Sequence, residues 1–154
     1  RERDGLVVNH YRHEEGSVYQ KLGWHTDSLR DVFYFEKPRR YLNVGFYIDD
    51  SPKTKGGVRV LPGTHEQSLW SMLTRKIHFM NYEPDPDEIA IEADAGDLTI
   101  HDGRLWHRVA QATVTGDASQ RRVMYLPLMN GPLKLKDEKS PTPFYFHLRK
   151  LAGY

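Results

Sequence analysis

The sequence predicts a mainly β protein, a sandwich or a barrel that contains few helices. Two observations lead to this fold class. Short stretches rich in β-branched and aromatic residues recur along the chain, and turn-forming clusters of Gly, Pro and Asp separate them. Only one segment has the pattern of a helix. A series of short strands with a single helix is typical of these two architectures.

The predicted strands are bounded by recognisable turn residues. Asp49-Asp50-Ser51-Pro52 closes the second strand, and Pro62-Gly63 closes the third. In chain order, we expect strands over residues 6–11, 41–48, 58–61, 89–92, 98–101, 105–112 and 121–128.

The segments between these strands also give local predictions. Residues 67–75 form the predicted helix, and Thr64 is placed to cap its N-terminus. Residues 82–88, which include two Pro, predict an exposed loop. Residues 133–143 resemble a linker.

Composition limits the class of protein. A chain of 154 residues fits a single domain over residues 1–154 with one core. The formal net charge of +1 gives no reason to expect a nucleic-acid partner, and no apolar run is long enough to span a membrane. A cytoplasmic location is compatible with these features. The chain starts at Arg1 without a methionine, so we expect that it lacks its natural N-terminal region.

The absence of cysteine limits the chemistry. Disulfide scaffolds, Cys-ligated zinc and Cys nucleophiles are all excluded. Any metal ion must be held by His and carboxylate side chains, which favours iron, manganese or zinc.

His25, Asp27 and His107 are the candidate ligands. Residues i and i+2 of a strand point to the same face, so His25 and Asp27 can both face inward while Thr26 faces away. A distant strand of a closed β structure can bring His107 opposite them. Two imidazoles and one carboxylate on a common face form a facial triad that holds Fe(II) and leaves coordination positions open. The spacing alone is weak evidence, because a second His-x-carboxylate pattern occurs at residues 13–15.

Three segments together resemble the phytanoyl-CoA dioxygenase family of iron- and 2-oxoglutarate-dependent oxygenases. Residues 23–27 (GWHTD) match the WHxD of the family, and residues 56–65 (GGVRVLPGTH) look like its NGxLxVLPGSH segment. Residues 96–122 are close to its GDxxxFHxxLxHxS…RR pattern. The three segments keep the order and approximate spacing of the family, and they cover about residues 20–128.

The resemblance implies a fold and a metal site. The fold would be a double-stranded β-helix, a jelly-roll or cupin-like core, formed by a single oxygenase domain. His25, Asp27 and His107 would be the ligands of Fe(II), with 2-oxoglutarate as co-substrate and O2 as oxidant. His101, Trp24 and Trp106 would support these ligands without binding the metal.

The resemblance also implies an arginine that holds the far carboxylate of 2-oxoglutarate. A guanidinium fork matches a carboxylate bidentately and stays charged at any working pH. Arg121 and Arg122 both stand at the head of the last predicted strand, and alternation with Val123 and Tyr125 favours Arg121. The turn over residues 111–120 is slightly longer than in the family, so Arg122 is kept as the alternative.

The strand over residues 41–48 is the other candidate for contact with 2-oxoglutarate, through Asn43 and Tyr47. In such folds this strand runs beside the co-substrate. Period-2 alternation leaves two alternatives open for the inward face: Asn43, Gly45 and Tyr47, or Leu42, Val44 and Phe46.

The expected activity is the hydroxylation, or a similar oxidation, of a C–H bond in a small-molecule substrate, with release of succinate and CO2. Related halogenases carry a small residue in place of the carboxylate ligand, so Asp27 favours hydroxylation over halogenation. Two other hypotheses stay open: a non-catalytic metal- or ligand-binding cupin-like module, and a zinc hydrolase with the same two His and one Asp. The sequence leaves the substrate and the oligomeric state open.

Overall fold

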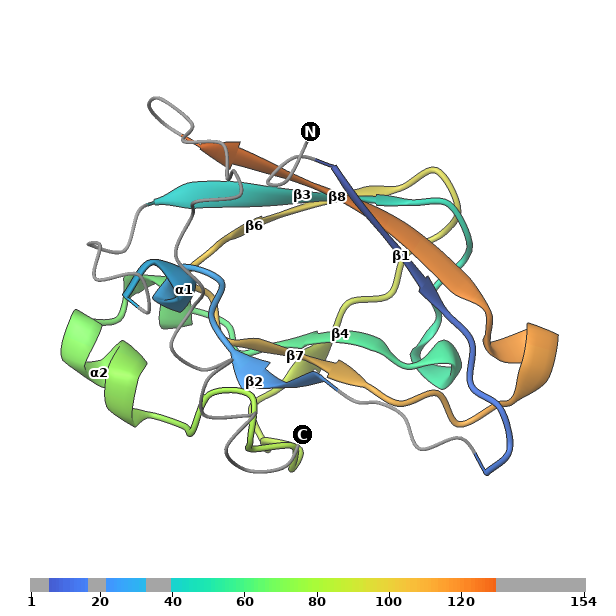
Figure 1. Ribbon diagram of the computed structural model, residues 1–154, viewed down its shortest axis with the longest axis horizontal. Helices are drawn as coiled ribbons and strands as arrows, with labels where there is room; N and C mark the ends of the chain where they lie inside the picture. Colours follow the sequence, from blue (N-terminus) through green and yellow to red (C-terminus); the bar gives the residue numbers. More distant parts are fainter. Residues whose placement is uncertain (1–5, 17–21, 33–39, 130–154) are drawn as a thin grey trace, which may run out of the picture.

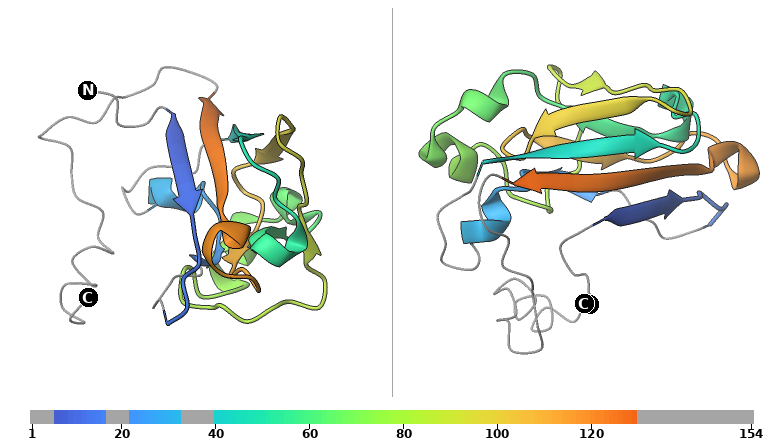
Figure 2. Two further views of the ribbon diagram at one scale, coloured as in Figure 1. Left: turned by 90° about the vertical axis from the view of Figure 1, so that its right-hand side faces the viewer. Right: turned by 90° about the horizontal axis from the view of Figure 1, so that it is seen from above.

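The computed structural model describes residues 6–16, 22–32 and 40–129. Two antiparallel sheets of four strands face each other in the described part of the chain (Figure 1). The first sheet has the order β1-β8-β3-β6, and its strands lie side by side when the molecule is seen from above (Figure 2). The second sheet has the order β2-β7-β4-β5. The strands are β1 (Val7–Tyr11), β2 (Leu22–His25), β3 (Tyr41–Tyr47), β4 (Gly57–Val60), β5 (Ile89–Ala90), β6 (Leu98–Asp102), β7 (His107–Ala110) and β8 (Arg121–Met129).

This strand order is that of a jelly roll. Strands that are neighbours in space are mostly distant in sequence, and the chain passes back and forth between the two sheets. The expected mainly β double-stranded β-helix is therefore confirmed. The linker-like segment 133–143 lies outside the described residues.

The helical elements differ from those expected. The predicted helix is shorter than residues 67–75: α2 covers Leu69–Thr74, and a four-residue α1 covers Leu29–Val32. The expected cap of α2 by Thr64 is wrong, because the Ser68 side chain accepts the hydrogen bond from the Ser71 N–H. Three short 3-10 helices also occur: η1 (Lys53–Lys55), η2 (Thr64–Glu66) and η3 (Gly116–Ser119). None of the helices in the described segments is long and apolar enough to cross a membrane.

Two strands are shorter than expected. The strand predicted from residue 105 begins only at His107, because a turn follows β6 and the Leu105 N–H donates to the Asp102 carbonyl. The strand predicted over residues 89–92 keeps only Ile89–Ala90, although the Ile91 N–H still donates to the Val58 carbonyl.

Alternation along β3 gives the first sheet an inner and an outer face. Asn43 lines a cavity between the sheets and Tyr47 is buried, whereas Leu42 and Phe46 are exposed. Of the two alternatives for this strand, the set with Asn43, Gly45 and Tyr47 therefore faces inward. The outer face carries exposed apolar side chains from three neighbouring strands: Leu42 and Phe46 of β3, Leu98 and Ile100 of β6, and Leu126 and Leu128 of β8.

Candidate metal centre

Strand pairing brings the two histidines together. His25 is the last residue of β2 and His107 the first residue of β7, and the two are direct partners across this antiparallel pair. Their ring centroids lie 4.1 Å apart. Residues that are 82 positions apart in sequence thus become neighbours through the fold, as the closed β structure predicts.

Asp27 reaches the same point by another route than expected. It lies beyond the end of β2, in the turn that leads into α1, so strand alternation does not explain its direction. Hydrogen bonds fix this turn: the Ser28 N–H donates to the Gly103 carbonyl, and the Leu29 N–H donates to the Thr26 carbonyl. Thr26 is fully buried, with its hydroxyl 3.4 Å from His78 Nε2.

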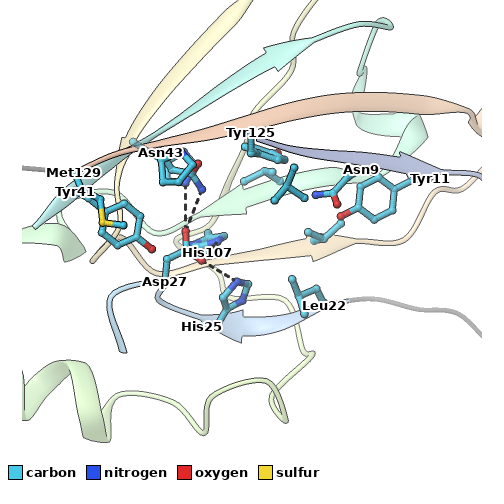
Figure 3. A pocket seen from close by; sticks show the side chains of 15 residues that line it. Asn9, Tyr11, Leu22, His25, Asp27, Tyr41, Asn43, His107, Tyr125 and Met129 are labelled. Carbon is cyan, nitrogen blue, oxygen red and sulfur yellow. Dashed lines mark hydrogen bonds and ion pairs between the residues drawn. The ribbon is translucent and has the colours of Figure 1, made fainter. Parts of the chain in front are cut away.

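The three side chains converge in the close view of Figure 3. Asp27 Oδ1 lies 3.6 Å from His25 Nε2 and 3.7 Å from His107 Nε2. One donor atom from each residue lies within 4.8 Å of the other two. Transition metals bind such donors at about 2.0–2.2 Å, so atoms at these separations can share one ion.

Backbone carbonyls set the orientation of both imidazoles. His25 Nδ1 lies 2.8 Å from the Gly23 carbonyl, and His107 Nδ1 lies 3.0 Å from the Leu105 carbonyl. A carbonyl only accepts, so each Nδ1 carries the proton. Each Nε2 then keeps its lone pair, which is the tautomer that binds a metal through Nε2.

Burial and mutual charge favour the metal-binding protonation states. Burial, together with the neighbouring His107, lowers the pKa of His25 to about 3, so this imidazole is neutral at neutral pH. Burial by itself raises the pKa of Asp27, but the histidines around it lower it further, and the net pKa is below its usual value. A neutral imidazole and an ionised carboxylate are the forms that bind metals.

Asn43 and His101 lie beside the second carboxylate oxygen. Asn43 Nδ2 donates to Asp27 Oδ2 at 3.2 Å, and His101 Nε2 lies 4.0 Å from the same oxygen. The two residues are direct partners between β3 and β6. Asn43 Oδ1 and His101 Nε2 are buried without a hydrogen-bond partner within the described part of the chain. Polar atoms in this state are expected to serve a bound ligand or water.

The donor atoms open onto a cavity of about 270 Å³ between the two sheets (Figure 3). Its lining combines the metal-centre residues with side chains from β1, β2, β3, β4, β7 and β8. These side chains include Asn9, Tyr11, Leu22, Tyr41, Val58, Val109, Tyr125, Pro127 and Met129. A second cavity of about 250 Å³ shares Val58, His101 and Tyr125 with the first, and Tyr47 lines it.

The two candidate arginines point in opposite directions. Arg121 is 3% exposed, its guanidinium lies 3.9 Å from the centroid of the Tyr11 ring, and its Nε donates to the Lys55 carbonyl. The side chain of Arg122 is 43% exposed and forms a bidentate pair with Asp49. Arg121 is therefore the arginine on the inner side of β8, next to a residue that lines the cavity.

The tryptophans next to the ligands belong to the core. Trp24 and Trp106 are fully buried and pack with Leu61. The indole N–H of Trp24 donates to the Glu83 carbonyl, and that of Trp106 donates to Gln67 Oε1. Each tryptophan precedes one of the two candidate histidine ligands, so this packing fixes the backbone next to both candidates.

The sequence did not point to three features near the centre. Phe79 stacks on His25, and His78 contacts the Trp106 ring. Arg108 is buried and forms a bidentate pair with Glu88. Nothing in the sequence of the loop before β5 indicates that its Glu88 pairs with Arg108, 20 positions further along the chain.

Comparison with curated proteins identifies a relative by sequence. The curated dioxygenase af480 of Aspergillus fumigatus is 30% identical over 112 residues, which are 66% of this chain and 32% of that protein. The chain thus spans about a third of the length of this relative.

Solved structures share the fold at lower identity. The epimerase SnoN, solved with Fe3+, alpha ketoglutarate and nogalamycin RO, superposes with a TM-score of 0.62 at 17% identity, over 90% of this chain and 57% of SnoN. EctD from S. alaskensis, solved with 2-oxoglutarate and 5-hydroxyectoine, has a TM-score of 0.59 at 17% identity, over 92% and 51% of the two chains. EvdO2 from Micromonospora carbonacea var. aurantiaca, complexed with 2-oxoglutarate, has a TM-score of 0.56 at 19% identity, over 86% and 55%.

The family assignment follows from the sequence pattern of phytanoyl-CoA dioxygenases (PhyH), which matches residues 5–122. The match covers most of the chain and includes both histidines, Asp27 and the arginine pair. The chain belongs to the phytanoyl-CoA dioxygenase family.

Proposed function

We propose that this chain forms the core of an Fe(II)- and 2-oxoglutarate-dependent dioxygenase that oxidises a C–H bond of a small-molecule substrate. The observation that carries the proposal is the convergence of His25 Nε2, His107 Nε2 and Asp27 Oδ1 at one end of a cavity. Two imidazoles and one carboxylate that bind from one side leave open positions on the ion, as non-haem iron oxygenases require.

The donor set fits Fe(II). Both Nε2 atoms keep their lone pairs because a backbone carbonyl occupies each Nδ1. Asn43 donates to the carboxylate oxygen that does not face the imidazoles, and this orients Asp27 with Oδ1 toward the ion. His25, Asp27 and His107 would hold the metal, and Asn43 would fix the direction of its carboxylate ligand.

Held by His25, Asp27 and His107, Fe(II) would supply oxidative chemistry in which one oxygen atom of O2 goes to succinate as 2-oxoglutarate loses CO2, and the other goes to the substrate. The protein would position the reactants and exclude water from the reacting atoms. Val58, Val109 and Leu22 form an apolar wall next to the ligands, which limits access of water to the reacting atoms.

Arg121 is proposed to hold the far carboxylate of 2-oxoglutarate. Its guanidinium is buried beside Tyr11, and Tyr125 of the same strand lines the cavity. A guanidinium fork at this position matches the geometry of a carboxylate, which it can bind with two hydrogen bonds. The second N–H of Asn43 Nδ2 and the Tyr47 hydroxyl are proposed as further donors to the co-substrate.

Hydroxylation is proposed as the outcome because Asp27 retains the carboxylate ligand. Solved structures of the same fold are named for different reactions. SnoN is named an epimerase, and another such protein, ThoJ, is named a non-heme monooxygenase. The substrate class proposed here is a small organic molecule that fits between the two sheets.

The test measures succinate formed from 2-oxoglutarate with Fe(II) and ascorbate in air. We expect the wild type to release succinate, and His25→Ala and His107→Ala to lose both iron binding and succinate release. The control His10→Ala changes an exposed histidine of β1 and is expected to keep both. Full activity in either ligand variant would refute the assignment.

Two other outcomes would identify the alternative functions. Tight metal binding without any succinate would indicate a binding module. Zinc in the protein purified without oxygen, with a hydrolytic activity that needs no O2, would indicate a hydrolase.

A further inference from the structure

A loop far from the ligands in sequence contacts the metal centre. Residues 77–81 follow α2, and none of them belongs to a strand or to the predicted helix. The ring of Phe79 is stacked on the imidazole of His25, with centroids 4.7 Å apart and an interplanar angle of 25°. Two rings therefore lie against the imidazole of His25, those of Phe79 and His107.

Phe79 holds this position in a strained backbone conformation. Its φ is 63°, and among the described residues it is the one non-glycine with a positive φ. For a bulky side chain this conformation is a steric outlier, and such strain persists only where the surroundings enforce it. Strained residues of this kind gather at functional sites.

Backbone pairing with β2 enforces the conformation. The Phe79 N–H donates to the Trp24 carbonyl at 2.8 Å, and the Trp24 N–H donates to the Asn81 carbonyl at 2.8 Å. β2 is the edge strand of its sheet, so the loop occupies the hydrogen-bonding groups of a free edge. Gly23 allows this approach, because a Cβ at that position would lie 2.6 Å from the Phe79 carbonyl oxygen.

The same loop contacts the other two ligands through their neighbours. His78 lies with its ring centroid 4.2 Å from that of Trp106, which precedes His107. His78 Nε2 also lies 3.4 Å from the hydroxyl of Thr26, which stands between His25 and Asp27. This short loop thus contacts His25 directly through Phe79. Through His78 it contacts the residues next to His107 and Asp27 in the chain.

We propose that Phe79 is a positioning residue for the metal centre: its stacked ring fixes the imidazole of His25 so that Nε2 faces the ion. The hydrogen bond from Nδ1 to the Gly23 carbonyl leaves the ring free to tilt about that bond. The phenyl ring blocks this tilt, and the left-handed backbone of Phe79 places the phenyl ring there. The inference rests on the proposed function in one respect, namely that His25 binds a metal.

The test uses Co(II) as the probe and measures its Kd from visible absorption, together with the Tm of the metal-free protein. Phe79→Gly removes the ring and relieves the backbone strain, whereas Phe79→Tyr keeps the ring. Met80→Gly is the matched control, because Met80 is the next residue of the loop and is 73% exposed. Loss of a group that orients a ligand typically weakens metal binding by about 10–100-fold.

We expect Phe79→Gly to raise the Kd for Co(II) by about 10–100-fold, with a Tm no lower than that of Met80→Gly. Phe79→Tyr and Met80→Gly should bind Co(II) like the wild type. Equal affinity in Phe79→Gly and the wild type would overturn the inference, as would a loss of affinity that follows Tm across all three variants. A wild type that does not bind Co(II) would instead overturn the proposed function.

Discussion

Asp27 has different neighbours at its two carboxylate oxygens. Oδ1 faces both imidazoles, and Oδ2 accepts the hydrogen bond of Asn43. The sequence suggested Asn43 as a contact of the co-substrate, and the structure adds this bond to Asp27. At the scale of single residues, the proposed metal centre therefore combines candidate ligands with a group that orients one of them.

Removal of the Asn43 amide is expected to weaken metal binding. Asn43→Leu deletes the donor to Asp27 Oδ2, so the carboxylate loses its orientation and the Kd for Co(II) should rise about 10–100-fold. Phe46→Leu is the control, because Phe46 lies on the exposed face of the same strand. Metal titration by absorption spectroscopy measures the effect. Unchanged affinity in Asn43→Leu would mean that Asn43 has no part in orienting Asp27.

The two arginines of β8 are expected to differ in their effect on 2-oxoglutarate. A hydrogen bond to a charged group contributes about 1.5–3 kcal/mol, so Arg121→Gln should raise the KM for 2-oxoglutarate by at least about 10-fold. Arg122→Gln should leave this KM unchanged, because Arg122 is exposed and paired with Asp49. Succinate release at varied 2-oxoglutarate measures both. The reverse result would assign the co-substrate to Arg122.

At the scale of elements, pairing between β2 and β7 positions the histidines, and a partly buried ion pair connects β7 to the loop before β5. Arg108 of β7 donates two hydrogen bonds to the Glu88 carboxylate at 2.6 and 2.7 Å. Arg59 of β4 lies 4.0 Å from the same carboxylate. Both arginines are buried, so Glu88 compensates two charges on the second sheet.

Loss of the Glu88 charge is expected to destabilise the fold. Glu88 is partly buried, and leaving its charged partner without a hydrogen-bond acceptor typically costs about 1–3 kcal/mol. Glu88→Gln should therefore lower the free energy of unfolding in urea by about 1–3 kcal/mol at neutral pH. Glu83→Gln in the same loop is the control, because Glu83 is exposed. Equal stability of Glu88→Gln and the wild type would show that the pair contributes nothing.

The effect of this variant should depend on pH. Burial raises the pKa of Glu88, but the hydrogen bonds and charge of Arg108 lower it further, and the net pKa is below its usual value. A carboxyl group with a lowered pKa stabilises the folded state above its unfolded pKa, and this contribution is lost as the pH falls through the folded pKa. The difference between wild type and Glu88→Gln should therefore be full above about pH 5 and shrink in acid.

At the scale of the whole molecule, the sequence predicts the jelly roll well and the connections poorly. Strands such as β3 and β8 are long enough for their β-branched and aromatic residues to give a clear pattern. β2 has four residues, one of which is Gly23, and α1 has four residues as well, so neither is long enough to show a period. Sequence patterns also say nothing about pairs made by folding, such as Arg108 with Glu88.

The metal centre shows the same division. The approach of His25 to His107 was expected from a closed β structure, and the pairing of β2 with β7 produces it. Their role as metal ligands stays a prediction. The direction of Asp27 depends on the turn before α1, and the contact of Phe79 depends on a left-handed residue in a loop. Neither feature has a local sequence signal, because each is enforced by groups that are distant along the chain.

The outer face of the first sheet is expected to control solubility. Ile100 and Leu126 flank Val44 on this face and are both exposed. A contiguous exposed apolar surface promotes association, so Ile100→Lys combined with Leu126→Lys should reduce self-association in analytical ultracentrifugation. The affinity for Co(II) should not change, because the inward side chains are untouched. Greater self-association in the double variant would contradict this prediction.

The measurement that tests the central claim most directly is the fate of labelled dioxygen. The wild type with Fe(II) and 2-oxoglutarate is exposed to ¹⁸O2, and succinate is analysed by mass spectrometry. We predict that succinate gains a single ¹⁸O atom in the wild type and that His107→Ala forms no labelled succinate. Labelled succinate at the wild-type rate in His107→Ala, or none in an iron-loaded wild type, would contradict the account of His25, Asp27 and His107 as an oxygenase centre.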